Sequence, residues 1–303
     1  FCVPKFRLLL IVERKKMKTQ TSVRDTDEGA TKDTVKTDSI QVASSSPLRL
    51  SEEEYKQIFQ HFDATHKNLP LFLETDVFPS QNFNPDMATA LDIGPGSFVI
   101  TDRLIEMFQQ VDVVEPSTEF QIMGQSRNLR TIYKGTFEEF DFTSPDSPKY
   151  DFILASHVLY HVEQSEWKHW IEKMVASLKP DGIAVIIMSS MKGEVCQRIA
   201  KHFETPGITA DNVRNVLDTN QFRYETFWRD GTFELEEREQ CQNLIKFIVY
   251  EDAISEEVFQ KLTQQELLDT EEKISQCCNE CENRSGKYTF STIDELFVLR
   301  PKQ

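Results

Sequence analysis

The sequence has no apolar run that approaches the roughly 18 residues needed for a membrane-spanning helix. Its first stretch, Phe1–Val12, is short and apolar but carries Lys5 and Arg7, and the basic cluster Arg14–Lys16 follows it. A secretory signal has its positive charges before the apolar part and a small-residue cleavage site after it. The order here is the reverse, so we expect a cytoplasmic protein without a membrane partner.

Positive charge is also scarce, since 34 basic residues stand against 50 acidic ones and the formal net charge is -16. Contacts with nucleic-acid phosphates need lysine and arginine. We therefore expect no nucleic-acid partner, and we interpret the excess of acidic side chains as a source of solubility.

Cysteines are few and do not form paired metal-binding motifs. Three of the six, Cys277, Cys278 and Cys281, form a C-C-x-x-C pattern in an acidic segment with helical periodicity. Tetrahedral zinc needs a fourth ligand, and no second C-x-x-C or pair of histidines follows. The pattern favours reduced thiols on a helix, and we predict no metal site.

Large apolar residues are almost absent from residues 18–46, which are rich in Thr, Ser, Asp and Lys. Such a composition cannot bury enough surface to offset the entropy cost of ordering the chain. We predict a disordered extension over residues 1–47 and one domain over residues 48–303. The hydrophobic content of 39%, with 22 Phe, is sufficient for a sizeable core.

Two helical regions are predicted to flank the central part of this domain. Residues 48–88 begin with Ser51 and Glu54 at capping-box spacing and are predicted to form a helical lid. Near the other end, Asp230–Gly231 signals a turn after a strand, and residues 234–284 are predicted to form an acidic helical insertion before a closing strand.

The most informative stretch, residues 89–108, reads T-A-L-D-I-G-P-G-S-F-V-I-T-D-R-L-I-E-M-F. Ala90–Ile93 has the length of a buried strand, and apolar residues fall at helical spacing from Ser97 onward. Between them lies the turn Gly94-Pro95-Gly96, where the glycines let the backbone bend sharply and approach a ligand. The third glycine of the dinucleotide fingerprint and the Gly-Lys-Ser/Thr of the Walker loop are both missing, which argues against NAD and nucleoside triphosphates.

An acidic residue follows the next predicted strand. Val111–Val114 ends at Glu115, and Pro116 then stops the strand. A carboxylate in this place can accept hydrogen bonds from both hydroxyls of a ribose. The order strand, glycine turn, helix, strand and acid therefore predicts a nucleoside-binding site that includes Asp92 and Glu115.

Thr136 and Phe137 follow a third predicted strand, in a loop that would lie beside an adenine. Phe137 has a second interpretation of equal weight, as a core residue at the start of a helix. A fourth predicted strand begins at Tyr150 and is followed by further polar and aromatic candidates, namely Ser156, His157, Tyr160 and His161. Because ligands bind outside the carboxyl ends of strands in open α/β sheets, we expect these side chains in the site.

Three motifs resemble those of class I S-adenosylmethionine-dependent methyltransferases: D-x-G-x-G at Asp92–Gly96, Y-D-x-I…L-x-H-V at Tyr150–Val162, and L-K-P-D-G, predicted to form a turn at Leu178–Gly182 before an apolar strand. The resemblance implies an α/β, Rossmann-like fold, with a seven-stranded mixed sheet, helices on both faces and a small helical substrate-binding subregion. It also implies S-adenosylmethionine as the cofactor. The residues expected to bind it are Asp92, Gly94, Pro95, Gly96, Glu115, Thr136, Phe137, Ser156 and His157.

Within this class the chain looks most similar to the histamine N-methyltransferase family. Shared features are V-V-E-P-S at Val113–Ser117, L-D-x-x-x-x-x-Y-E at Leu217–Glu225, and K-x-x-F at Lys287–Phe290. The resemblance implies substrate contacts at positions where this chain differs from the family, which are Asn68, His161, Thr226 and Thr292. The family has glutamate, tyrosine, cysteine and asparagine there, and glutamine at the position of His157, so the methyl acceptor stays open.

We predict a monomeric methyltransferase that acts on an amine or imidazole nitrogen of a small molecule. His157 and His161 are candidates for accepting a proton, because histidine titrates near neutrality. Tyr160 is expected to pack under the methionine tail or the substrate ring. A catalytically silent S-adenosylmethionine-binding protein of the same fold and a nucleotide-dependent oxidoreductase remain as alternatives.

Overall fold

The computed structural model describes residues 58, 65, 68–204, 207–249 and 262–301. The predicted extension over residues 1–47 and the predicted cap at Ser51 and Glu54 lie outside these residues. Among the described helices, none is long and apolar enough to cross a lipid bilayer.

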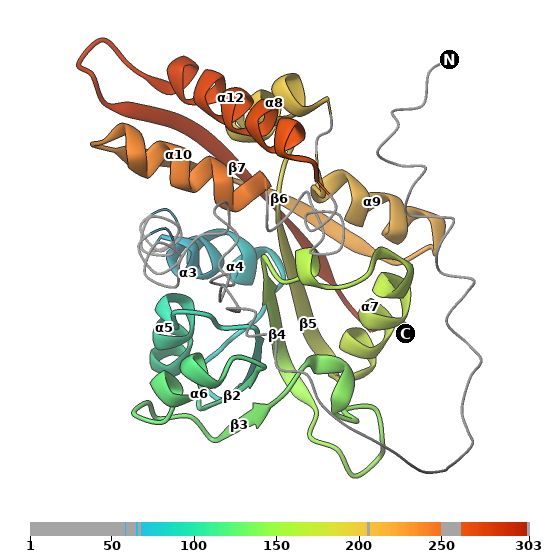
Figure 1. The fold of residues 1–303 in the computed structure, drawn as a ribbon. Helices are drawn as coiled ribbons and strands as arrows, with labels where there is room; N and C mark the ends of the chain where they lie inside the picture. Colours follow the sequence, from blue (N-terminus) through green and yellow to red (C-terminus); the bar gives the residue numbers. More distant parts are fainter. Residues whose placement is uncertain (1–57, 59–64, 66–67, 205–206, 250–261, 302–303) are drawn as a thin grey trace, which may run out of the picture. The chain divides into compact units, whose positions relative to one another are not determined.

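Seven strands form one sheet in the order β3-β2-β1-β4-β5-β7-β6 (Figure 1). The strands β1 to β5 are parallel, and β7 is antiparallel to both of its neighbours, β5 and β6. Their bounds are β1 (Thr89–Ile93), β2 (Gln110–Glu115), β3 (Thr131–Lys134), β4 (Tyr150–Ser156), β5 (Leu178–Ser189), β6 (Tyr224–Leu235) and β7 (Tyr288–Leu299). The predicted seven-stranded mixed sheet is confirmed.

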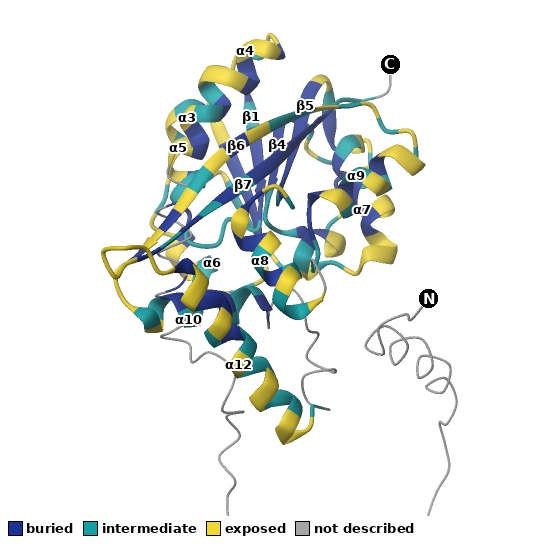
Figure 2. Ribbon diagram, turned by 90° about the horizontal axis from the view of Figure 1, so that it is seen from above, coloured by how far each residue is buried: buried dark blue, intermediate teal, exposed yellow. Residues whose placement is uncertain are grey.

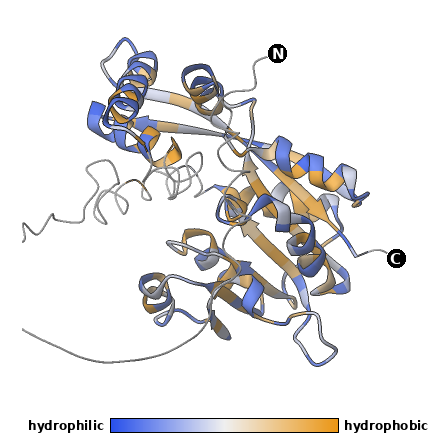
Figure 3. Cartoon of the chain, turned by 45° about the vertical axis from the view of Figure 1, so that its right-hand side comes forward, coloured by the Kyte–Doolittle hydropathy of each residue, from blue (hydrophilic) through white to orange (hydrophobic). Residues whose placement is uncertain are grey.

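Helices cover both faces of the sheet, as predicted. One face packs against α7 (Trp167–Ala176) and α9 (Ala210–Thr219), through side chains such as Trp170 and Val213. The other packs against α3 (Leu69–Phe72), the π-helical turn η1 (Leu73–Val77), α4 (Phe78–Ser80) and α5 (Val99–Met107). Figure 2 shows β1, β4, β5 and β7 as mostly buried, and Figure 3 shows the central strands as mostly apolar. Among the described residues, α6 (Thr118–Gly124) lies between β2 and β3.

A separate cluster of helices lies beside the ends of β6 and β7 (Figure 1). It contains α8 (Glu194–Phe203), α10 (Arg238–Phe247) and α12 (Gln264–Cys281), and it has its own buried apolar core. The cysteines among the described residues are buried thiols in this region: Cys196, Cys241, Cys277, Cys278 and Cys281. No group of three or more potential metal ligands occurs within the described parts of the chain.

Two predicted turns are wrong, because both segments lie within strands and each contains a glycine that closely approaches the neighbouring strand. The segment Leu178–Gly182 belongs to β5, where the pairing with β4 shifts register and an added Cβ at Gly182 would lie 2.8 Å from the Tyr150 carbonyl oxygen. Asp230–Gly231 is paired within β6, and a Cβ at Gly231 would lie 2.8 Å from Thr292 Cγ2 on β7. In both places glycine permits a close approach to the neighbouring strand rather than a reversal of the chain.

Candidate functional site

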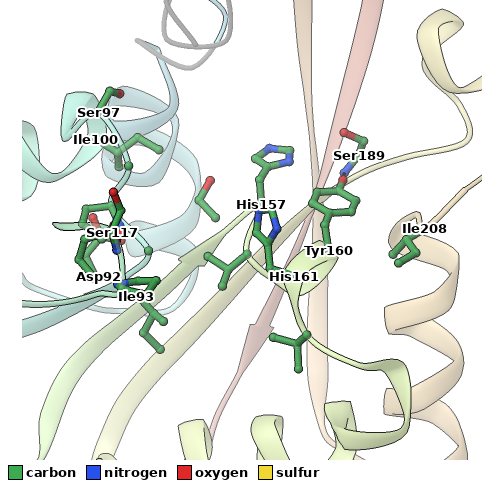
Figure 4. A pocket seen from close by; sticks show the side chains of 18 of the residues that line it. Asp92, Ile93, Ser97, Ile100, Ser117, His157, Tyr160, His161, Ser189 and Ile208 are labelled. Atoms are coloured by element: carbon green, nitrogen blue, oxygen red, sulfur yellow. Dashed lines mark hydrogen bonds between the residues drawn. The ribbon is translucent and has the colours of Figure 1, made fainter. Parts of the chain in front are cut away.

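A cavity of about 440 Å³ lies at the carboxyl ends of the parallel strands (Figure 4). Most of the predicted site residues line it: Asp92, Gly94, Pro95, Gly96, Glu115, Thr136, Phe137, Ser156, His157, Tyr160, His161 and Thr292. Asn68, just before α3, and Thr226, opposite Phe297 on β7, do not. No described residue of the predicted lid, residues 48–88, lines the cavity either.

The glycine turn joins β1 to the start of α5. Gly94 has a φ of +68° and Gly96 a φ of +53°, and the Gly94 N–H donates to the Val114 carbonyl at 2.9 Å. A Cβ at Gly94 would lie 2.9 Å from Val158 Cγ2. Both the left-handed backbone and the lack of space therefore require glycine at position 94.

Two carboxyl groups flank this turn. Asp92 is buried, and its Oδ2 accepts a hydrogen bond from Thr101 Oγ1 at 2.6 Å. Burial raises the pKa of Asp92 to about 7; the Thr101 hydrogen bond opposes this shift, and the charge of Glu115 adds to it. Burial also raises the pKa of Glu115, although the backbone N–H groups of Ser117 and Gly96 donate to its carboxylate.

Phe137 is both a core residue and a cavity residue. It begins the 3₁₀ turn η2 (Phe137–Glu139), stacks on Phe142 at a centroid distance of 5.5 Å and packs against Trp170 at 4.9 Å. Trp170 also lines the cavity, and its buried indole N–H has no hydrogen-bond partner among the described residues. The two sequence interpretations of Phe137 are therefore compatible in space.

The polar centre of the cavity follows β4 (Figure 4). His157 has a φ of +57°, a left-handed conformation that costs a non-glycine residue on the order of 1–3 kcal/mol. Its N–H donates to the Ile187 carbonyl at 3.0 Å, and its ring stacks on Tyr160 at a centroid distance of 6.0 Å. Tyr160, in the 3₁₀ turn η3 (Leu159–His161), accepts at its hydroxyl the Ser189 N–H at 3.0 Å. A further 3₁₀ turn, η4 (Gln164–Glu166), leads into α7.

Asp294 and its partner Arg229 are functional candidates that the sequence analysis did not find. Asp294 on β7 lines the cavity, is 1% exposed, and has its Oδ1 at 3.5 Å from His157 Nε2. Its other oxygen forms a buried ion pair with Arg229 on β6. The available signal was the acidic pair Asp294–Glu295 directly before the apolar run Leu296–Leu299 of the closing strand, where a charge is buried only if it is paired.

The far wall of the cavity is apolar and comes from the separate helical cluster and its surroundings. The apolar side chains there are Val195, Cys196, Ile199, Ile208, Phe233, Phe247 and Ile248. The pocket therefore has a polar half beside the glycine turn and an apolar half beside α8 and α10.

The donor set suits a cationic nucleoside better than a phosphate. Among the described residues that line the cavity, carboxylates come from Asp92, Glu115, Glu138 and Asp294, and none is lysine or arginine. Its volume lies within the roughly 300–1,000 Å³ of small-molecule sites. The glycine turn, the Glu115 carboxylate at the end of β2 and the acidic lining together fit S-adenosylmethionine.

This fold and site define the class of S-adenosylmethionine-dependent methyltransferases. Comparison of the sequence with known families agrees, because the family described as "Methyltransferase domain" matches residues 52–245, more than half of the chain. The chain belongs to this family, and S-adenosylmethionine is its cofactor. The oxidoreductase alternative is therefore excluded.

Curated relatives include an "Uncharacterized methyltransferase" of Staphylococcus carnosus, 27% identical over 57% of this chain and 74% of that protein. The "N-terminal Xaa-Pro-Lys N-methyltransferase 1-A" of Xenopus laevis is 28% identical over 37% of this chain. The chain spans 56% of that relative and 45% of its Homo sapiens counterpart, about half of their length. Among solved structures, the YcgJ protein of Bacillus subtilis has a TM-score of 0.47 and 14% identity, covering 78% of this chain and 100% of that one.

Proposed function

We propose that the enzyme methylates an amine or imidazole nitrogen of a small molecule, as its resemblance to histamine N-methyltransferases implies. The observation that supports this most is the composition of the cavity, which joins an acidic half at the glycine turn to an apolar half at α8 and α10. A small organic cation has the matching chemistry, because a carboxylate attracts its charge and an apolar wall receives its hydrocarbon part.

The residues proposed to hold the cofactor come from three strand ends. Gly94, Pro95 and Gly96 let the backbone approach it, and Glu115 accepts the ribose hydroxyls. Ser156 and Phe137 complete this half of the cavity, with Thr136 and Asp92 beside them. When bound, S-adenosylmethionine supplies a methyl group already activated on a positively charged sulfur.

His157 is proposed to accept the proton that the acceptor nitrogen must lose. The nitrogen lone pair forms the new carbon–nitrogen bond, the electron pair of the broken carbon–sulfur bond stays on sulfur, and the proton passes to the imidazole. A nucleophile held near the methyl carbon in line with the leaving sulfur gains several kcal/mol from positioning alone. His161 and Thr292 also line the cavity and are proposed as acceptor contacts, whereas Asn68 and Thr226 lie away from it.

The test is a methyl-transfer assay on a panel of small amines and imidazoles that includes histamine. We expect His157→Ala to lower kcat at least tenfold, because a general base contributes on the order of 10²–10⁴. The affinity for S-adenosylhomocysteine, measured by calorimetry, should change less than about twofold. Equal loss of turnover and of affinity would make His157 a structural residue.

The same panel decides between the remaining acceptor classes. A peptide beginning with Xaa-Pro-Lys belongs in it, because relatives carry that acceptor in their names. Transfer to that peptide alone would replace the small-molecule proposal, and binding of S-adenosylmethionine without transfer to any acceptor would favour the catalytically silent alternative. The monomeric state and the cytoplasmic location remain predictions that sedimentation and cell fractionation would test.

A further inference from the structure

Asp294 and Arg229 form a buried pair directly behind His157. Asp294 is 1% exposed and Arg229 is 6% exposed, and they face each other across the β6–β7 pairing. Arg229 Nη1 also donates to the Thr65 carbonyl at 2.7 Å. The Arg229 side chain is thus fixed at two points, and it holds one oxygen of the Asp294 carboxylate in place.

The second oxygen of Asp294 is directed at the histidine. Oδ1 lies 3.5 Å from His157 Nε2, while the histidine backbone is anchored in its left-handed conformation by the bond to the Ile187 carbonyl. Because an ionised carboxylate only accepts hydrogen bonds, a hydrogen bond between the two side chains would place the proton on Nε2. The other ring nitrogen, Nδ1, is then the atom that can take a proton from a substrate.

We propose that Asp294 is a positioning residue that orients the His157 imidazole through Nε2 and stabilises the imidazolium formed when Nδ1 takes a proton. Arg229 weakens this stabilisation, because its positive charge offsets part of the negative charge on Asp294. It also holds the Asp294 carboxylate in one orientation, because it binds the other oxygen of the same group. The proposal rests on the proposed function only for the identity of the proton donor. The electrostatic coupling between Asp294, Arg229 and His157 can be measured without any substrate.

The test is an NMR titration of the His157 ring, assigned by the loss of its signal in His157→Gln. In Asp294→Asn the midpoint of the titration should fall by about one pH unit or more, because the anion is lost and Arg229 stays uncompensated. In Arg229→Gln it should rise, because the anion is kept without its cation. Opposite signs are the signature of electrostatic positioning, since general loosening of the site would move both variants the same way.

Other titratable groups near His157 are unchanged in these variants, and a matched control tests the loss of a different buried carboxylate on β7. The other titratable side chains that line the same cavity are Asp92, Glu115, Glu138, Tyr160, His161 and Cys196, and none of the variants alters them. Glu295, next along β7, is also 1% exposed and is paired with Arg214 on α9. Glu295→Gln therefore removes a comparable buried carboxylate and should leave the His157 midpoint unchanged.

Kinetics provide the second readout. Asp294→Asn should lower kcat about tenfold or more and leave the KM for S-adenosylmethionine within about twofold, whereas Glu295→Gln should change neither. Unchanged midpoints of the His157 titration, or shifts of the same sign in both variants, would overturn the proposal. If Asp294→Asn does not fold, the midpoint in Arg229→Gln alone decides it. Opposite shifts in a protein that methylates no amine would overturn only the proposed function.

Discussion

At the scale of single residues, Gly94 is required by the local geometry of its turn and is also proposed to contact the cofactor. Its positive φ costs a residue with a side chain about 1–2 kcal/mol, and the Val158 side chain leaves no room for a Cβ. Gly286 has a φ of +80°, but a Cβ added there would meet no described atom within 4 Å. A substitution at Gly286 therefore incurs the backbone strain without a steric clash.

We therefore predict that Gly94→Ala and Gly286→Ala both lower the free energy of unfolding by about 1 kcal/mol through backbone strain. Gly94→Ala should be the more destabilising of the two, and only this variant should weaken binding of S-adenosylhomocysteine. Chemical denaturation and calorimetry measure the two effects. Equal affinities in the two variants would show that the glycine turn does not touch the cofactor.

At the scale of helices and strands, the sequence patterns were most reliable where one apolar face repeats. The strands β1 to β4 and the helix α5 were predicted because their apolar patterns reflect burial on a sheet face. The turn signals at Leu178–Gly182 and Asp230–Gly231 failed because a glycine that serves a close strand approach looks the same in sequence as one that serves a reversal. Asp294 was missed because its partners Arg229 and His157 are brought beside it only by the fold.

The close approach of β6 and β7 yields an element-level prediction, since Thr292 lines the cavity opposite Gly231. Gly231→Ala should push the Thr292 side chain and raise the KM for the acceptor several-fold, with cofactor affinity unchanged. Adding Thr292→Ser removes the clashing Cγ2 and should restore most of the KM. Such recovery is the coupling expected of contacting residues, and strictly additive effects would contradict it.

At the scale of the whole molecule, the excess of acidic groups includes several that line the active-site cavity. The titration of one of them, Asp92, makes the free energy of unfolding depend on pH. Burial raises the pKa of Asp92 from its usual 3.8 to about 7 in the folded protein. Between these two values the unfolded chain releases a proton that the folded chain keeps. Rising pH then favours unfolding, so the stability contributed by this group declines from about pH 4 to pH 7 and is constant above that range.

Asp92→Asn removes this titration and keeps an oxygen that can accept the Thr101 hydrogen bond. We predict that the difference in free energy of unfolding, variant minus wild type, increases between pH 4 and pH 7 by up to a few kcal/mol and then levels off. Denaturation of both proteins without cofactor across this range measures the difference directly, and it cancels the contributions of all other titrating groups. A difference that stays flat with pH would show that Asp92 is already ionised in the folded protein at pH 5, and the acidic half of the cavity would then carry its full negative charge throughout.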